Sequence, residues 1–126
     1  MITLELPGIK DTEFEASAAL DGDALVFRMW GNADLRVNGP LGPFLDSIDH
    51  EARRQKVREV VADLRELVFM NSSCLKEFVR WVAHAEERGE SPYLIRFLSD
   101  PTAQWQMRSL QALRAFAPGL ISIQED

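Results

Sequence analysis

The first third of the chain alternates apolar and polar residues, which is the pattern of half-buried β-strands. Residues 13–20 ("EFEASAAL") and 24–30 ("ALVFRMW") are two such runs, and the "DGD" between them is a turn sequence. A β-hairpin is therefore expected, ending at Gly31. Residues 2–6 ("ITLEL") predict a short further strand, which the following Pro7-Gly8 pair interrupts.

Beyond a loop over residues 31–40, the apolar spacing changes from two residues to about 3.6. This spacing predicts a helix over residues 41–56. Pro40 and Pro43 suit the approach to that helix and its first turn, because proline lacks the N–H that an interior position donates. The next run, "VREVVADLREL" (residues 57–67), has the dense β-branched composition of a buried strand.

Two more helix–strand pairs complete the pattern. Apolar residues between Leu75 and Ala85 recur at helical spacing, and Gly89 is expected at the position just after that helix. A strand "YLIRFL" follows. The third helix has Asp100 as its expected N-cap and ends before Pro118-Gly119, and "LISI" is the last strand.

This order predicts one α/β domain over residues 1–126, with a mixed central sheet and helices on one or both of its faces. The expected order is β-β-α-β-α-β-α-β. Residues 1–12 would add an N-terminal strand and a loop.

Composition narrows the class of protein. Of the 126 residues, 46% are hydrophobic and 27% charged, which is a globular balance. The net charge of -6 argues against nucleic-acid binding and against anionic membranes. A single cysteine fits a reducing cytoplasm, and neither a signal peptide nor a membrane span is expected.

Catalytic and cofactor motifs are not found in the sequence. His50 and His84 have no ligand at metal-binding spacing, and the glycines form no phosphate loop. Cys74 would lie in the first turn of a helix, which favours a thiolate, but no base stands near it in sequence. We therefore expect no metal, no cofactor and no enzyme, and interpret Cys74 as a packing residue.

The junction "LVFMNSSCLKEF" sets an apolar strand against three polar residues and a helix. Asn71, Ser72 or Ser73 can cap the helix. A phosphate on either serine would meet free amides and the positive end of the helix dipole, so a phosphorylation switch is physically reasonable. Trp81 either flanks the core of this helix or belongs to a partner surface.

Three segments resemble the STAS domain family, which includes the bacterial anti-sigma factor antagonists. "DLRELVFMNSSCLKEF" is similar to the segment that in the family ends in Asp-Ser-Ser-Gly-Leu. "FRMWGNAD" resembles the strand that ends in Gly-x-x-Asp, which matches Gly31 and Asp34. The terminal "FLSDPTAQWQMRSLQALRAFAPGLISI" resembles the final strand, helix and strand. The resemblance spans roughly residues 13–123 and implies a STAS fold.

The resemblance also implies a regulatory mechanism. Ser72 matches a serine that a GHKL-type anti-sigma factor kinase phosphorylates and a PPM-type phosphatase restores, Ser73 is its neighbour, and Asp34 is the acidic residue near it. Two residues depart from the family, since Asn71 replaces an aspartate and Cys74 a glycine. The junction is also similar to that of SiaC-type regulators, small STAS-like proteins that control a diguanylate cyclase.

The leading hypothesis is a non-enzymatic protein-binding module switched at Ser72, whose partner is a kinase, a phosphatase or another STAS protein. The alternatives are a scaffold subunit without a switch, a SiaC-type regulator, and, last, a small enzyme. The predicted partner surface comprises Asp34, Asn71, Ser72, Ser73, Cys74, Lys76, Glu77, Arg80 and Trp81.

Overall fold

The computed structural model describes residues 5–86 and 92–125, and the structural statements below concern this part of the chain. It contains six strands and three helices. In chain order they are β1 Glu5–Lys10, β2 Phe14–Asp21, β3 Ala24–Ala33, α1 Leu35–Arg54, β4 Glu59–Met70, α2 Ser72–Ala85, β5 Leu94–Ser99, α3 Gln104–Phe116 and β6 Ile121–Glu125.

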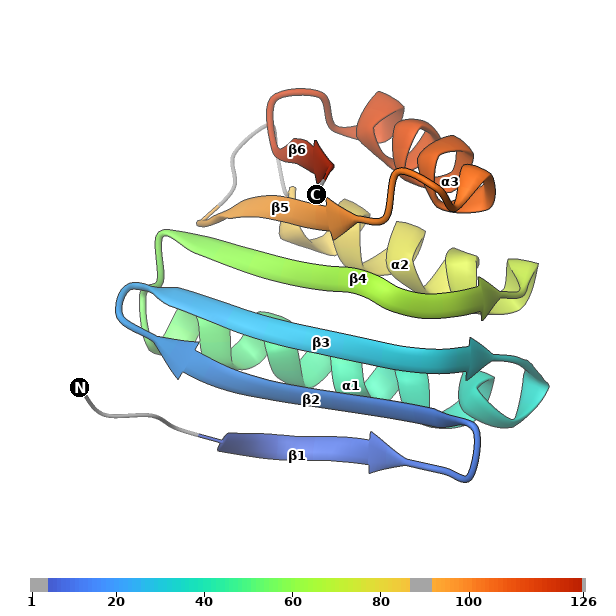
Figure 1. The fold of residues 1–126 in the computed structure, drawn as a ribbon. Coiled ribbons are helices and arrows are strands. Elements are labelled where there is room, and N and C mark those ends of the chain that lie inside the picture. Colours follow the sequence, from blue (N-terminus) through green and yellow to red (C-terminus); the bar gives the residue numbers. More distant parts are fainter. Residues whose placement is uncertain (1–4, 87–91, 126) are drawn as a thin grey trace.

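The strands form a single mixed sheet whose spatial order equals the chain order, β1-β2-β3-β4-β5-β6. Strands β1 to β3 pair antiparallel, and β3 to β6 pair parallel. Each parallel connection passes through a helix and steps in the same direction, so right-handed crossovers place the helices on one face. Figure 1 shows α1 and α2 behind the sheet, with α3 beside α2. The predicted mixed α/β fold is confirmed, and the helices cover one face.

The core lies between that face and the helices. Along β2, buried Phe14, Ala16 and Ala18 alternate with more exposed neighbours, as the hairpin prediction required. Phe27 of β3 and Trp81 of α2 meet edge to face, with ring centroids 5.6 Å apart. The bulky rings in the middle of the layer therefore fix how α2 sits on the sheet.

Strand β1 differs from its prediction at its C-terminal end. It continues through Pro7 and Gly8 to Lys10, with a register shift between Leu6 and Ile9. Proline is tolerated because β1 is an edge strand, so the N–H that proline lacks is not needed for a second neighbouring strand. The register shift leaves Pro7 and Gly8 out of the pairing with β2. Residues 2–4 of the predicted strand lie outside the described residues.

Helix α1 begins at Leu35, six residues before the predicted start at residue 41. Asp34 is its N-cap and accepts a hydrogen bond from the Arg36 amide at 3.0 Å. Pro40 and Pro43 consequently lie inside the helix, not at its approach. The early start buries Val37 on the same face as Leu41, and the prolines sit on the solvent side, where water can satisfy the carbonyls they leave unpaired.

Helix α3 begins later than predicted. The Asp100 carboxylate accepts from the amide and hydroxyl of Thr102, at 2.9 and 2.7 Å, and so closes a turn. The N-cap is Ala103, which has no capping side chain. Asp100 was therefore wrongly expected as the N-cap, because its side chain satisfies a turn three residues upstream. The predicted Gly89 helix stop lies outside the described residues.

Candidate functional site

Two helix N-termini meet at the carboxyl ends of the central parallel strands. Strand β3 ends at Ala33 and α1 follows, while β4 ends at Met70 and α2 follows. The Asn71 amide donates to the Ala33 carbonyl oxygen at 2.9 Å, which ties the two junctions together. The crevice at the carboxyl ends of parallel strands is where open α/β sheets place their functional residues.

Asn71 caps α2. Its Oδ1 accepts from the Cys74 amide at 2.8 Å, as an N-cap side chain does three residues ahead of it. Ser72, the first helical residue, is exposed, and Ser73 is half-buried. Among the described residues neither serine hydroxyl makes a hydrogen bond. The cap is thus supplied by Asn71, and Ser72 is not needed for it.

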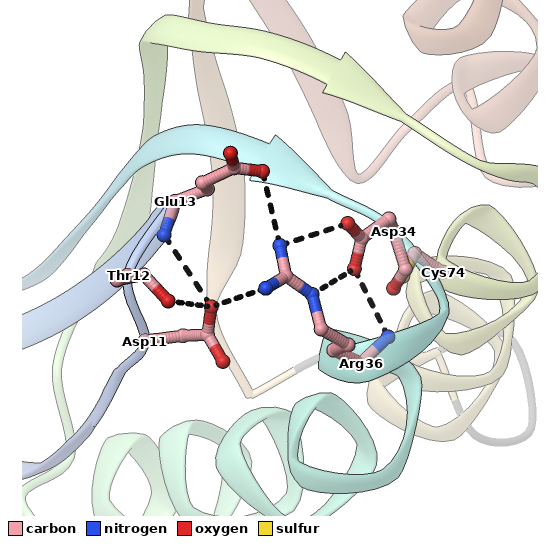
Figure 2. A network of polar contacts seen from close by, with 6 residues as sticks. All are labelled: Asp11, Thr12, Glu13, Asp34, Arg36 and Cys74. Carbon is pink, nitrogen blue, oxygen red and sulfur yellow. Dashed lines mark hydrogen bonds and ion pairs between the residues drawn. The ribbon is translucent and has the colours of Figure 1, made fainter.

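A network around Arg36 lies beside this junction (Figure 2). The guanidinium contacts three carboxylates, those of Glu13 and Asp34 at 3.1 Å and that of Asp11 at 3.4 Å. The side-chain and backbone hydrogen bonds from Arg36 hold the pKa of Asp34 below its ordinary value, and Asp34 and Asp11 raise the pKa of Arg36. The network therefore carries two net negative charges at neutral pH.

Gly31 lets the carboxylates of the β1–β2 turn reach this network. Its φ is +93°, and a Cβ there would lie 2.0 Å from the Glu13 carbonyl oxygen. That same oxygen accepts from the Asn32 amide at 2.7 Å. Only glycine permits so close a backbone approach at a positive φ.

Cys74 is fully buried, and its Sγ lies 3.7 Å from the Asp34 carbonyl oxygen. Burial, with the nearby Asp34 and Glu77 carboxylates, raises the pKa of the thiol to about 11. At neutral pH the residue is a protonated packing group. Cys74 was expected on the partner surface, and this is corrected, because its side chain fills the space under the first turn of α2. A nucleophilic Cys74 is not supported either.

Trp81 is also buried, which corrects its place on the predicted partner surface. It is 2% exposed, and its indole N–H donates to the Tyr93 hydroxyl oxygen at 3.0 Å. Tyr93 in turn donates to Asp49 at 2.6 Å. The buried stripe of α2 includes Cys74 and Trp81, so the core face is rotated toward them relative to the predicted apolar stripe.

The remaining residues of the predicted surface on α2 stay accessible to different degrees. Lys76 and Arg80 are exposed, and Glu77 is half-buried. Arg80 pairs with Asp46 at 3.1 Å and with Glu77 at 3.2 Å, so it joins α2 to α1. Lys76 lies on the exposed side of the helix. Whether these side chains bind a partner stays a prediction.

Sequence reasoning missed the Arg36 network. Arg36 follows Asp34 by two residues, so its link to that cap is local and was readable from the sequence. Asp11 and Glu13 are distant in sequence, and only the antiparallel pairing of β2 with β3 brings them close. Periodicity carries no signal for such a contact.

The described residues contain no group of three or more histidine, cysteine, aspartate or glutamate side chains arranged to hold a metal ion. Nor does any helix among them combine the length and apolar character needed to cross a bilayer. The junction itself presents an exposed hydroxyl, that of Ser72, at a helix N-terminus beside the negatively charged Arg36 network.

Comparison with solved structures identifies two similar folds. SiaC of Pseudomonas aeruginosa matches with a TM-score of 0.59 and 19% sequence identity, over 100% of both chains. An uncharacterised protein of the DUF3478 family with a SpoIIAA-like fold, from Shewanella loihica, matches with a TM-score of 0.56 and 16% identity, over 94% of this chain and 93% of that one. No family model and no curated protein matches the sequence. The similarity confirms the predicted STAS-like fold and the likeness to SiaC.

Proposed function

We propose that this chain is a non-catalytic regulatory module that binds a protein partner at the start of α2 and is switched by phosphorylation of Ser72. One observation carries the proposal. Ser72 is the exposed first residue of α2, while Asn71 supplies the cap, so the hydroxyl is accessible and can be modified without loss of the capping bond.

Electrostatics supports a switch at this position. A phosphoserine at the first helical position meets the first-turn amides and the positive end of the macrodipole, which stabilise a dianion. The same phosphate, stable on this chain, would weaken the binding of the partner. The Arg36 network already carries excess negative charge, and a phosphate would add about two charges to the same end of the molecule. A partner that docks across Ser72 when it is neutral would then be repelled.

The resemblance and the fold support two classes of partner. Anti-sigma factor antagonists bind a GHKL-type kinase and are restored by a PPM-type phosphatase, and SiaC-type regulators control a diguanylate cyclase. The SiaC-type alternative is supported by the full-length structural likeness to SiaC. Both assignments use the same surface: Asp34, Asn71, Ser72, Ser73 and the exposed side of α2 at Lys76, Glu77 and Arg80.

The test is co-expression with the GHKL-type kinase encoded nearest to this gene, followed by intact-mass measurement and capture of partners. The wild-type chain should gain one phosphate, Ser72→Ala none, and the matched control Ser73→Ala one. Ser72→Glu should lose partner binding, and Ser72→Ala should retain it. Phosphorylation that persists in Ser72→Ala, or equal partner binding by all variants, would show the switch to be wrong.

A scaffold subunit without a switch is the second candidate, favoured by Asn71 and Cys74 in place of the family's aspartate and glycine. Because Asn71 supplies the cap, Ser72→Ala should change the unfolding free energy little under either candidate. A multiprotein assembly that keeps its composition with both Ser72→Ala and Ser72→Glu would favour the scaffold.

A further inference from the structure

The face of the sheet opposite the helices carries an exposed tryptophan. Trp30 of β3 is 47% exposed, whereas the side chain of its neighbour Met29 is buried in the core on the other face. Among the described residues no helix covers the face on which Trp30 lies (Figure 1). An indole on a central strand, free of the core, is the kind of side chain that anchors a partner.

Two glutamates flank this indole in register. Glu15 of β2 is the pairing partner of Trp30 on one side, and Glu66 of β4 is its pairing partner on the other. Neighbouring strands lie about 4.8 Å apart, so the two side chains border the ring. Together with Ser17 and Arg28, these three residues line a hollow of about 300 Å³.

Three charged side chains line the hollow, and within the part of the chain that the structure describes they differ in whether they are paired: Arg28 is paired, and Glu15 and Glu66 are not. Among the described residues, neither the Glu15 nor the Glu66 carboxylate has a hydrogen-bond or ion-pair partner. Lys10 pairs with Glu15 in register, yet no ion pair forms between their side chains. The Arg28 guanidinium is directed to Asp63, with its Nε 3.1 Å from Oδ2. An aromatic face with two unpaired carboxylates beside it is complementary to a cation.

We propose that this hollow binds the side chain of an arginine or a lysine presented by a basic segment of a partner protein. The cation stacks on the indole face of Trp30, and the carboxylates of Glu15 and Glu66 accept its hydrogen bonds. The surface shares no residue with the Ser72 junction. It therefore holds or fails independently of the proposed switch.

The experiment uses the full chain and two peptides that differ in the charge of their two arginine positions. The first is acetyl-Gly-Arg-Gly-Arg-Gly-amide, and the second carries neutral citrulline in place of each arginine. The indole N–H resonances are followed by ¹H–¹⁵N NMR during titration, and Trp30→Phe assigns the signal of Trp30. We expect the arginine peptide to move that signal saturably, with the Trp81 signal unchanged and the citrulline peptide at least 5-fold weaker.

Matched variants separate a specific site from general attraction to an acidic protein. Glu15→Gln combined with Glu66→Gln should weaken the arginine peptide at least 5-fold. Asp21→Asn combined with Glu125→Gln changes the net charge equally at exposed positions away from the hollow, and should leave the affinity unchanged.

Three outcomes would overturn the proposal. Equal shifts with the citrulline peptide would make the surface a neutral contact. Equal weakening in both double variants would reduce it to net charge. A Trp30 signal that moves on dilution of the protein alone would assign the face to a second copy of the chain. Ser72→Glu should leave the titration unchanged, so this test and that of the switch fail separately.

Discussion

Residues 71–74 have different structural roles, although they lie within a single turn of helix. Asn71 caps the helix, Ser72 faces solvent, and Cys74 fills the core beneath them. The family resemblance treats Asn71 and Cys74 as departures. In the structure both have a packing or hydrogen-bonding reason that does not involve a partner. The accessible chemistry of the junction is therefore concentrated in Ser72.

Asn71→Ala should destabilise the protein by about 1 kcal/mol, because the Cys74 amide loses its capping acceptor. Urea denaturation monitored by circular dichroism measures the change. Asn71→Asp is the control, since it keeps the acceptor and adds charge that the helix N-terminus favours. Equal loss of stability in both variants would show that capping is not the reason.

Cys74 should make stability depend on pH in the alkaline range. Its pKa is raised to about 11 in the folded protein, above the ordinary value of 9.0, so the unfolded chain loses the proton first. The contribution is complete below about pH 9 and is lost between about pH 9 and 11. Urea titrations from pH 8 to 10.5 should show a decline that Cys74→Ala reduces. An unchanged slope in the variant would contradict the assignment.

At the scale of elements, the Gln106 side chain joins α3 to the C-terminal half of β4. Pairing of β4 with β5 ends at Asp63, and Gln106 Nε2 donates to the Leu64 and Leu67 carbonyl oxygens, at 2.7 and 2.8 Å. Its Oε1 accepts from the Asp100 amide at 3.0 Å. This buried amide donates to carbonyls that a longer β5 would have bound, in the stretch of β4 where its register with β3 shifts.

Gln106→Leu should destabilise the protein by at least about 2 kcal/mol, because it leaves buried carbonyls without a donor. Gln104→Leu is the control, since Gln104 is exposed on the same helix. Denaturation measures both, and hydrogen exchange should locate the loosened amides of Gln106→Leu around residues 64–70. Equal stability of the two variants would contradict the role of Gln106.

The close approach of β2 to the end of β3 depends on Gly31. Gly31→Ala should destabilise by more than about 1 kcal/mol, because the Cβ would meet the Glu13 carbonyl oxygen at a positive φ. Gly119→Ala is the opposite case. Gly119 lies in an exposed turn with open space around it and no positive φ, so alanine there should change stability by less than about 0.5 kcal/mol. Thermal unfolding compares them, and equal effects would refute the steric account.

Element type and order were predictable because apolar spacing reports which face is buried. Element boundaries were not. Pro40 and Pro43 suggested a late start for α1, but the Asp34 cap and the burial of Val37 outweighed them. At the site, the capping role was readable from Asn71. The burial of Trp81 was not, because it depends on Tyr93 and Phe27, which come from other elements.

At the scale of the whole molecule, the acidic groups predict how stability falls in acid. Burial alone would raise the pKa of Asp63, but the hydrogen bonds and charge of Arg65, with the charge of Arg28, hold it below its ordinary value. The pKa of Asp34 and of Asp100 is also lowered, by bonds from Arg36 and from Thr102. These contributions are present above about pH 4 and are lost as the pH falls through the folded values.

We therefore expect the unfolding free energy to drop steeply below about pH 4, in urea titrations from pH 7 to 2.5. Asp63→Asn should lower stability at pH 7 and flatten the acid decline. Asp21→Asn, at an exposed position, should leave the curve unchanged. Parallel curves for wild type and Asp63→Asn would show that Asp63 does not contribute.

The agreement between strand order in the sheet and strand order in the chain has a kinetic consequence. Every strand pairs with the strand that precedes it, so no pairing waits for a distant segment to arrive. The hairpin of β2 and β3 can form first, and each helix–strand unit can then add to its edge. The hairpin contacts are local and form fast, whereas a parallel pair such as Arg28 and Asp63 closes over 35 residues and forms more slowly. A growing chain could thus assemble this sheet in the order in which it is synthesised.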